Sequence, residues 1–392
     1  MSSLFNVKRV FIDKKISRSI LGIEQLFKTN VQNSKRDMPI KSEQIIPFLN
    51  GGVIMSQMQK QIQLAKRPIG TPSIEDFAFI EAPIGTPSDG EVLIRTVYIS
   101  VDPYLRGRMQ DVKSYIPPFQ LNEVITSGVI GQVVESKSEQ FAKGDLIIGT
   151  LGWQEYSIAN EREIRKIDPT LAPVTANLSI IGMTGLTAYF GLLDIGQPKE
   201  GETVVVSGAA GAVGSTVGQI AKIKGARVVG IAGTEEKCRY LLNELGFDAV
   251  INYKKEDVPS ALEKACPNGI DIYFDNVGGV ISDAVFPLLN KFARIPVCGA
   301  ISAYNKVDID MGPRVQTALI KTSALMKGFT LGDYSNRFKE GGTALAKWLN
   351  EGKLKYEETI TEGFDHIIDA FLDLFKGANL GKQLVKVADI EE

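Results

Sequence analysis

The stretch from residue 201 to residue 233, GETVVVSGAAGAVGSTVGQIAKIKGARVVGIAG, limits the possible folds more than any other part of the chain. It opens with a β-branched run, Thr203 to Val206, that is typical of a strand buried on both faces. A glycine-rich turn follows, and apolar residues then recur at helical spacing. A second β-branched run, Arg227 to Ala232, closes the segment. The stretch therefore predicts a strand–turn–helix–strand unit.

The glycine-rich turn of this unit suits the binding of a dinucleotide. Glycines let the backbone approach a pyrophosphate, and the helix that follows points free N–H groups and its positive dipole end at the phosphate. A glycine pattern alone is weak support, but here it follows a strand and opens a helix, which is the context the mechanism requires. The alternative is a turn that only packs a helix on a sheet. We expect pyrophosphate contacts from Gly208, Gly211, Ala212, Val213 and Gly214.

Length and composition exclude several classes of protein. A chain of 392 residues is long enough for two domains, and 44% hydrophobic and 23% charged residues are ordinary for a globular protein. A net charge of −2 gives no electrostatic footprint for nucleic acid. No apolar run reaches the length of a membrane span. The three cysteines have neither disulfide nor metal spacing, so we expect a cytoplasmic protein that binds neither membrane nor nucleic acid.

Residues 1–54 differ from the rest, with 9 Lys and Arg against 4 Asp and Glu and no sustained periodicity. Three interpretations compete: a basic targeting presequence, a disordered basic tail, and a segment that is not natively translated. We favour the third, because the two glycine codons of Gly51 and Gly52 lie at a suitable distance upstream of Met55 to form a ribosome-binding site.

Short strand-like segments separated by glycine turns predict a small β-barrel-type domain after Met55. A loop, Val101 to Met109, directly follows the strongest of these segments, and such loops on a rigid scaffold tend to bind ligands. Alternatively, the loop is a proline turn in which Tyr104 packs and Asp102 caps a short helix. The expected strands are Gln61–Ile69, Phe77–Glu81, Glu91–Ser100, Ser127–Ser136 and Asp145–Trp153.

The same region lacks the side chains of a zinc site. Between Met55 and Lys237 there is no cysteine and no histidine, and the chain has one histidine, His366. A catalytic zinc ion needs about three protein ligands, usually Cys, His or carboxylate. We therefore predict no metal, and we expect His366 to be an exposed or half-buried helix residue.

From about residue 181, strand and helix patterns alternate, which predicts a doubly wound parallel sheet. The expected helices include residues 236–245 and 280–289. Ligands on such sheets bind beyond the carboxyl ends of the strands. Three segments are expected there: 275–279 (DNVGG), 298–304 (CGAISAY) and 328–331 (GFTL). Tyr304 is then placed to offer a hydroxyl near a nicotinamide, the alternative being a packed aromatic ring.

The end of the second strand of the unit favours NADP over NAD. An NAD enzyme usually has an acidic residue there, which holds the ribose 2′-hydroxyl. Gly233 and Thr234 occupy the place instead, and Lys237 follows within one turn, where it can reach a 2′-phosphate. Neighbouring glutamates weaken this signal, and the alternative is a solvated helix face.

The last segment returns to the pattern of the first domain, with a strand, a helix around His366 and a final strand at 383–387. We expect a discontinuous GroES-like domain, residues 55–180 and 345–392, around a Rossmann domain, residues 181–344.

Several ordered motifs resemble those of the medium-chain dehydrogenase/reductase superfamily, and specifically its zinc-independent branch of NADPH-dependent alkenal/one reductases. That branch includes the leukotriene B4 dehydrogenase/prostaglandin reductases and bacterial curcumin reductase. The resemblance covers about residues 58 to 386. Its motifs are SVDPYLRGRM (100–109), GMTGLTAYFGL (182–192), the glycine turn, FDNVGG (274–279), CGAISAYN (298–305) and GANLGK (377–382).

The resemblance implies a role for each matching position. Lys237 and Tyr253 would hold the 2′-phosphate, while Tyr104 and Tyr304 would face the substrate. One departure is an extra residue in 241–246, which should lengthen a helix end. The other residues expected to bind NADP(H) are Met183, Thr184, Asn276, Cys298, Gly299, Ala300, Ile301, Ser302, Phe329, Thr330, Leu331 and Asn379.

The implied reaction transfers hydride from NADPH to the β-carbon of an α,β-unsaturated aldehyde or ketone. Charge then develops on the carbonyl oxygen, and the Tyr304 hydroxyl is the expected donor to it. Relatives suggest a homodimer. Two alternatives remain: a quinone reductase of the same superfamily, and a non-catalytic NADPH-binding sensor.

Overall fold

The computed structural model describes residues 57–391. The expectations for residues 1–54 lie outside this range. Within it, no helix is both long and apolar enough to cross a membrane.

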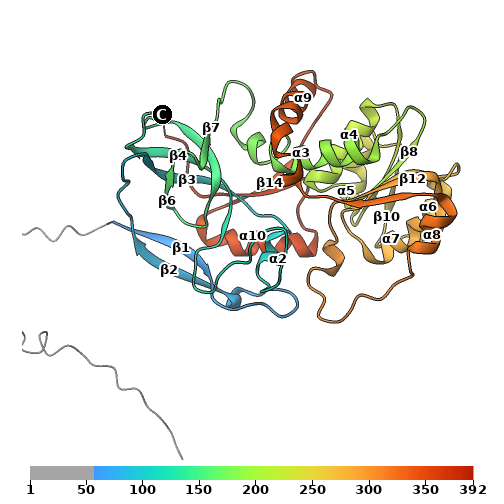
Figure 1. Ribbon diagram of the computed structural model, residues 1–392, viewed down its shortest axis with the longest axis horizontal. Coiled ribbons are helices and arrows are strands. Elements are labelled where there is room, and N and C mark those ends of the chain that lie inside the picture. Colours follow the sequence, from blue (N-terminus) through green and yellow to red (C-terminus); the bar gives the residue numbers. More distant parts are fainter. Residues whose placement is uncertain (1–56, 392) are drawn as a thin grey trace, which may run out of the picture. The chain divides into compact units, whose positions relative to one another are not determined.

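The first sheet combines strands from both ends of the described chain, as expected (Figure 1). Its order is β14-β15-β3-β4-β5-β7, and β6 pairs with β3. The C-terminal strand β15 runs antiparallel to β3, with Leu384 opposite Ser100. The sequence-based prediction of a GroES-like domain completed by the C-terminal segment is therefore correct. The strands are β3 (Glu91–Ser100), β4 (Thr126–Ser136), β5 (Leu146–Gly152), β6 (Tyr156–Asn160), β7 (Ile164–Lys166), β14 (Glu358–Glu362) and β15 (Lys382–Lys386).

Three aromatic side chains pack together in the core of the GroES-like domain. The indole of Trp153 is fully buried and packs against Phe77 and Phe371, which also contact each other edge to face. Phe77 begins β2 (Phe77–Pro83), which pairs with β1 (Met58–Leu64) as a separate two-stranded sheet. Phe371 belongs to α10 (Ile367–Lys376), so the C-terminal helix shares the core of the N-terminal strands.

The second sheet has six parallel strands in the order β10-β9-β8-β11-β12-β13. This order and direction confirm the predicted doubly wound sheet, although the exact domain limits stay a prediction. The strands are β8 (Thr203–Ser207), β9 (Arg227–Ala232), β10 (Ala249–Asn252), β11 (Ile270–Phe274), β12 (Leu289–Val297) and β13 (Leu325–Gly328).

The β-branched run in β8 is buried on both faces because helices cover both (Figure 1). Val204 and Val206 pack in the same cluster as helix α4, whereas Val205, with the opposite orientation, packs with α6 and α7. The remaining helices of the described range are α2 (Leu105–Arg108), α3 (Met183–Phe190), α4 (Ala212–Ile223), α5 (Glu235–Arg239), α6 (Val258–Ala265), α7 (Gly279–Val285), α8 (Gln316–Thr322) and α9 (Phe338–Asn350).

Two expected helices end differently from the sequence pattern. The expected helix from 280 to 289 stops at Val285, where a 3₁₀ turn containing Pro287 leads into β12. The helix expected from 236 to 245 is α5 followed by a π-helical turn, Tyr240–Glu244. This turn includes part of the segment with the extra residue, which is consistent with the lengthened helix end.

Candidate active site

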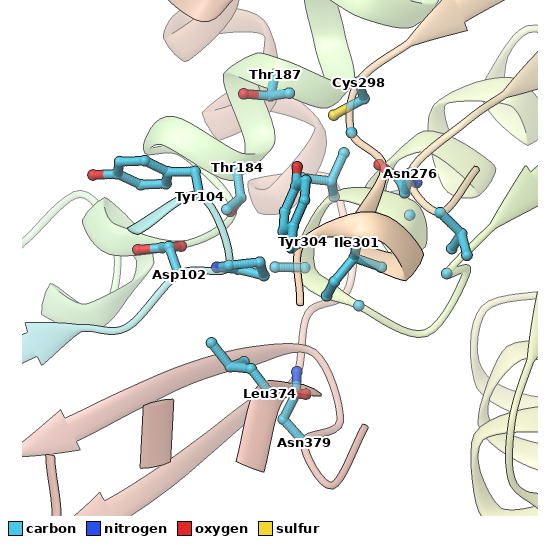
Figure 2. A pocket seen from close by; sticks show the side chains of 18 of the residues that line it. Asp102, Tyr104, Thr184, Thr187, Asn276, Cys298, Ile301, Tyr304, Leu374 and Asn379 are labelled. Carbon is cyan, nitrogen blue, oxygen red and sulfur yellow. The ribbon is translucent and has the colours of Figure 1, made fainter. Parts of the chain in front are cut away.

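A cavity of about 1200 Å³ lies at the carboxyl ends of the parallel strands. Residues directly after β8, β9, β11 and β12 line it, as the doubly wound fold requires. The loop after β3 and the segment that leads into β15 complete its wall (Figure 2). The cavity is therefore built from both sheets.

Nearly all the residues selected from the sequence line this one cavity. The exception is Ala300, whose N–H instead donates to the Tyr304 hydroxyl at 3.4 Å. The lining residues are Tyr104, Met183, Thr184, Gly208, Gly211, Ala212, Val213, Gly214, Lys237, Tyr253, Asn276, Cys298, Gly299, Ile301, Ser302, Tyr304, Phe329, Thr330, Leu331 and Asn379.

The glycine turn has the geometry of an anion cradle. Gly208 has a φ of +59°, and a Cβ on Gly214 would lie 2.4 Å from the Gly208 carbonyl oxygen. Only glycine therefore lets the turn close this tightly onto helix α4. Gly211 caps α4 in an extended conformation without a side-chain hydrogen bond. The helix N-terminus is thus open toward the cavity, where its N–H groups can receive a phosphate.

Two lysines lie beyond the carboxyl ends of neighbouring strands, Lys237 in the helix after β9 and Lys254 in the turn after β10. Lys237 is half-buried; burial and the nearby Lys254 lower its pKa. Its Nζ donates to the Gly377 carbonyl at 2.8 Å, and Thr234 accepts from the Lys237 N–H at 3.2 Å. Lys254 also lines the cavity but was missed, because nothing in the sequence shows that it approaches Lys237. Two cations close together favour a doubly charged anion.

Asp275 fixes the loop after β11. Its buried carboxylate accepts hydrogen bonds from the hydroxyls of Ser207, Tyr273 and Ser282 and from two backbone N–H groups. Next to it, the Asn276 amide donates to the Ser207 carbonyl at 2.8 Å. This network ties β8 to β11 at the floor of the cavity.

Two tyrosines from different loops line the cavity (Figure 2). Tyr304 follows the 3₁₀ turn Ile301–Ala303, and Tyr104 precedes helix α2. Burial raises the pKa of both phenols, and the Asp102 carboxylate adds to the increase at Tyr104. Both therefore stay protonated at neutral pH and can donate a hydrogen bond to a developing oxyanion.

The structure corrects one alternative for the loop after β3. The Asp102 side chain does not cap helix α2; it accepts from Ser100 Oγ and pairs with Lys382, with Nζ 3.2 Å from Oδ1. Lys382 is 3% exposed and also donates to the Val101 carbonyl at 3.0 Å. This buried ion pair joins the Tyr104 loop to the start of β15.

Other cavity residues were missed by sequence reasoning. Arg108 and Asn305 belong to motifs that were recognised, so their positions beside the tyrosines gave a usable signal. Tyr115 lies in a proline-containing loop with no periodic pattern, and only the fold brings it to the cavity. Thr187 lies one helical turn after Met183 on α3 and lines the cavity with it.

Among residues 57–391, no three His, Cys, Asp or Glu side chains are grouped to hold a metal ion. His366 is exposed, 3.3 Å from Asp369, and does not line the cavity. Cys298 does line it, but burial raises the pKa of its thiol to about 12. A neutral thiol is a poor metal ligand and a poor nucleophile.

Two family models match the chain. One is described as the N-terminal domain of oxidoreductase and matches residues 60–167; the other is described as zinc-binding dehydrogenase and matches residues 212–348.

Curated relatives match over nearly their whole length. YfmJ of Bacillus subtilis (strain 168), which carries the name of an NADP-dependent oxidoreductase, is 66% identical over 86% of this chain and 99% of its own. The NADPH-dependent curcumin reductase of Escherichia coli (strain K12) is 45% identical over 85% of this chain and 98% of its own. The crystal structure of CurA from Vibrio vulnificus in complex with NADPH is 46% identical, with a TM-score of 0.81 over 84% of this chain and 99% of that one.

Proposed function

Because the chain belongs to the medium-chain dehydrogenase/reductase superfamily, in its alkenal/one reductase branch, we propose that it reduces the carbon–carbon double bond of α,β-unsaturated aldehydes and ketones. It is an NADP-dependent oxidoreductase, and its cofactor is NADPH. The name of the curcumin reductase supports an enone as the acceptor.

The residues of the cavity fit NADPH. The turn from Gly208 to Gly214 would hold the pyrophosphate. It is too tight for a side chain at Gly214, and the N–H groups at the N-terminus of α4 follow it directly. Lys237, with Lys254, would hold the 2′-phosphate by charge-assisted hydrogen bonds, and Tyr253 would border it. When bound, NADPH supplies the hydride.

The reaction needs a donor for the carbonyl oxygen of the substrate. Hydride addition at the β-carbon moves negative charge onto this oxygen, and a hydrogen bond there stabilises the enolate. The Tyr304 hydroxyl is our candidate, because it lines the cavity beside the loop after β12 and stays protonated at neutral pH. The observation that carries the proposal is that the Tyr304 phenol and the glycine turn line the same cavity. Tyr104, from the loop after β3, would also contact the substrate.

The second family model is described as zinc-binding, but the residues that the structure describes, 57–391, do not fit a zinc site. Its one histidine lies away from the cavity, and the cavity offers a single thiol, Cys298, with a strongly raised pKa. No step of the proposed reaction uses a metal.

The test is a panel of acceptors offered side by side with NADPH: 2-alkenals, enones and quinones. We expect NADPH oxidation with enals and enones and formation of the saturated carbonyl product, identified by mass spectrometry. Turnover confined to quinones would replace the proposal by a quinone reductase. NADPH binding without turnover of any acceptor would indicate a sensor.

A further inference from the structure

Arg106, in helix α2, lies 2% exposed and holds three separate segments together. Its Nε donates to the Asn305 side-chain oxygen at 3.0 Å. Its Nη2 donates to the carbonyl oxygens of Pro68 at 3.1 Å and Gly70 at 2.8 Å. The guanidinium therefore connects the turn after β1, helix α2 and the segment after the 3₁₀ turn Ile301–Ala303.

The position of this arginine is unfavourable for stability alone. Among the described residues no carboxylate pairs with it, and its Nη1 is buried without a hydrogen-bond partner. Burial lowers the pKa of the Arg106 guanidinium, and the charge of Asp76 only partly opposes this effect. A buried cation with an unsatisfied donor is costly, so stability alone does not explain this position.

The two segments that Arg106 joins carry the two candidate tyrosines. Tyr104 lies two residues before Arg106 and caps the same short helix. Tyr304 directly precedes Asn305, the residue that accepts from Arg106 Nε. The hydrogen bond from Arg106 to Asn305 therefore fixes the loop that carries Tyr104 relative to the loop that carries Tyr304. Catalytic donors need such fixed placement, because a small displacement from the developing charge forfeits most of their effect.

We propose that Arg106, acting through Asn305, is a positioning residue that sets the Tyr304 hydroxyl against the substrate. The inference rests on the proposed function and adds a residue that does not itself line the cavity. Loss of the bond lowers kcat much more than NADPH affinity, because the glycine turn and Lys237, which would hold the phosphates, lie on other segments.

The test uses Asn305, since replacing a buried arginine can prevent folding. Asn305→Leu removes the acceptor, and we expect kcat for an enone to fall about tenfold. Asn305→Asp keeps an oxygen for Arg106 Nε and should retain kcat within about threefold. NADPH dissociation constants, measured by fluorescence, should differ by less than about threefold among the wild type and these two variants. Arg106→Lys, which loses the planar fork, should behave like Asn305→Leu.

A double-mutant cycle separates positioning from a general structural role. In a Tyr304→Phe background, Asn305→Leu should lower kcat by less than about twofold, because the hydroxyl that it positions is absent. Arg294→Lys is the matched control: this arginine anchors β12 to Glu202 and to the Gly196 carbonyl, outside the cavity, and its loss should leave kcat unchanged.

The positioning role would be overturned if the effects of Tyr304→Phe and Asn305→Leu on kcat were additive. Equal losses of kcat in Asn305→Leu and Asn305→Asp would also overturn it. These outcomes require an active wild-type enzyme, so they are distinguishable from failure of the proposed reaction itself, which the acceptor panel detects.

Discussion

Tyr304 carries the most direct chemical consequence of the proposed reaction. Tyr304→Phe keeps the ring and removes the hydroxyl, so we expect kcat with an enone to fall about tenfold or more and NADPH affinity to stay unchanged. Because burial raises the pKa of the phenol, the protonated form persists through neutral pH. The kcat of the wild type should therefore be level from about pH 6 to 9 and fall only at higher pH. An alkaline fall that persists in the Phe variant would assign it to another group.

Lys237 tests the preference for NADPH. Lys237→Met removes one charge-assisted hydrogen bond, worth about 1.5–3 kcal/mol, so the KM for NADPH should rise at least tenfold. The KM for NADH, which lacks the 2′-phosphate, should stay the same. Burial lowers the pKa of this lysine, so it loses its proton at a lower pH than a free lysine, and NADPH affinity should weaken correspondingly early as the pH rises. Lys222→Met, at a surface pair with Asp248, is the control.

At the scale of elements, the tight turn into α4 is possible because Gly214 has no side chain. A Cβ at Gly214 would lie 2.4 Å from the Gly208 carbonyl oxygen, so Gly214→Ala must displace the turn. We expect NADPH binding, measured by calorimetry, to weaken at least tenfold while the protein stays folded. The control is Gly342→Ala in α9, where no atom lies within 4 Å of the new Cβ. That change should raise stability by about 0.5–1 kcal/mol. Full NADPH affinity in Gly214→Ala would contradict the cradle.

The elements with a strong local pattern were predictable. The β-branched run at β9, Arg227–Ala232, has the bounds read from the sequence, because burial on both faces requires such residues. The short strands β6 and β7 were not predicted, since a few residues give no periodic signal. The 3₁₀ turn after Val285 was missed because the helical spacing continues past it.

The sequence predicted most of the residues that form the site, but it did not predict which of them form hydrogen bonds with distant parts of the chain. Tyr304 and the glycine turn were predicted because each belongs to a motif of consecutive residues that can be recognised without the fold. The bond between Arg106 and Asn305 joins residues 199 positions apart, and the contact from Lys237 to Gly377 joins residues 140 apart. Such pairs depend on the packing of the whole chain, which no local pattern encodes.

For the whole molecule, the exposed edge of the parallel sheet leads us to predict a homodimer. Strand β13 ends this sheet, and its four residues are all exposed, including Leu325 at 52%. An edge with free backbone groups and apolar side chains favours pairing with a second copy. Sedimentation should give twice the mass of the chain, which is 42.7 kDa. Leu325→Lys should shift the protein toward monomer; a wild-type monomer at micromolar concentration would contradict this.

The place of β15 beside β3 also governs how the protein can be made. Lys382 donates to the Val101 carbonyl across 281 positions of sequence, so the ribosome must synthesise the chain through β15 before β3 gains this partner strand. The parallel sheet, whose strands all lie between these two points, can assemble while synthesis continues. Until β15 is synthesised, the N-terminal strands have an unpaired sheet edge. Protection by chaperones during translation should therefore matter most for these strands.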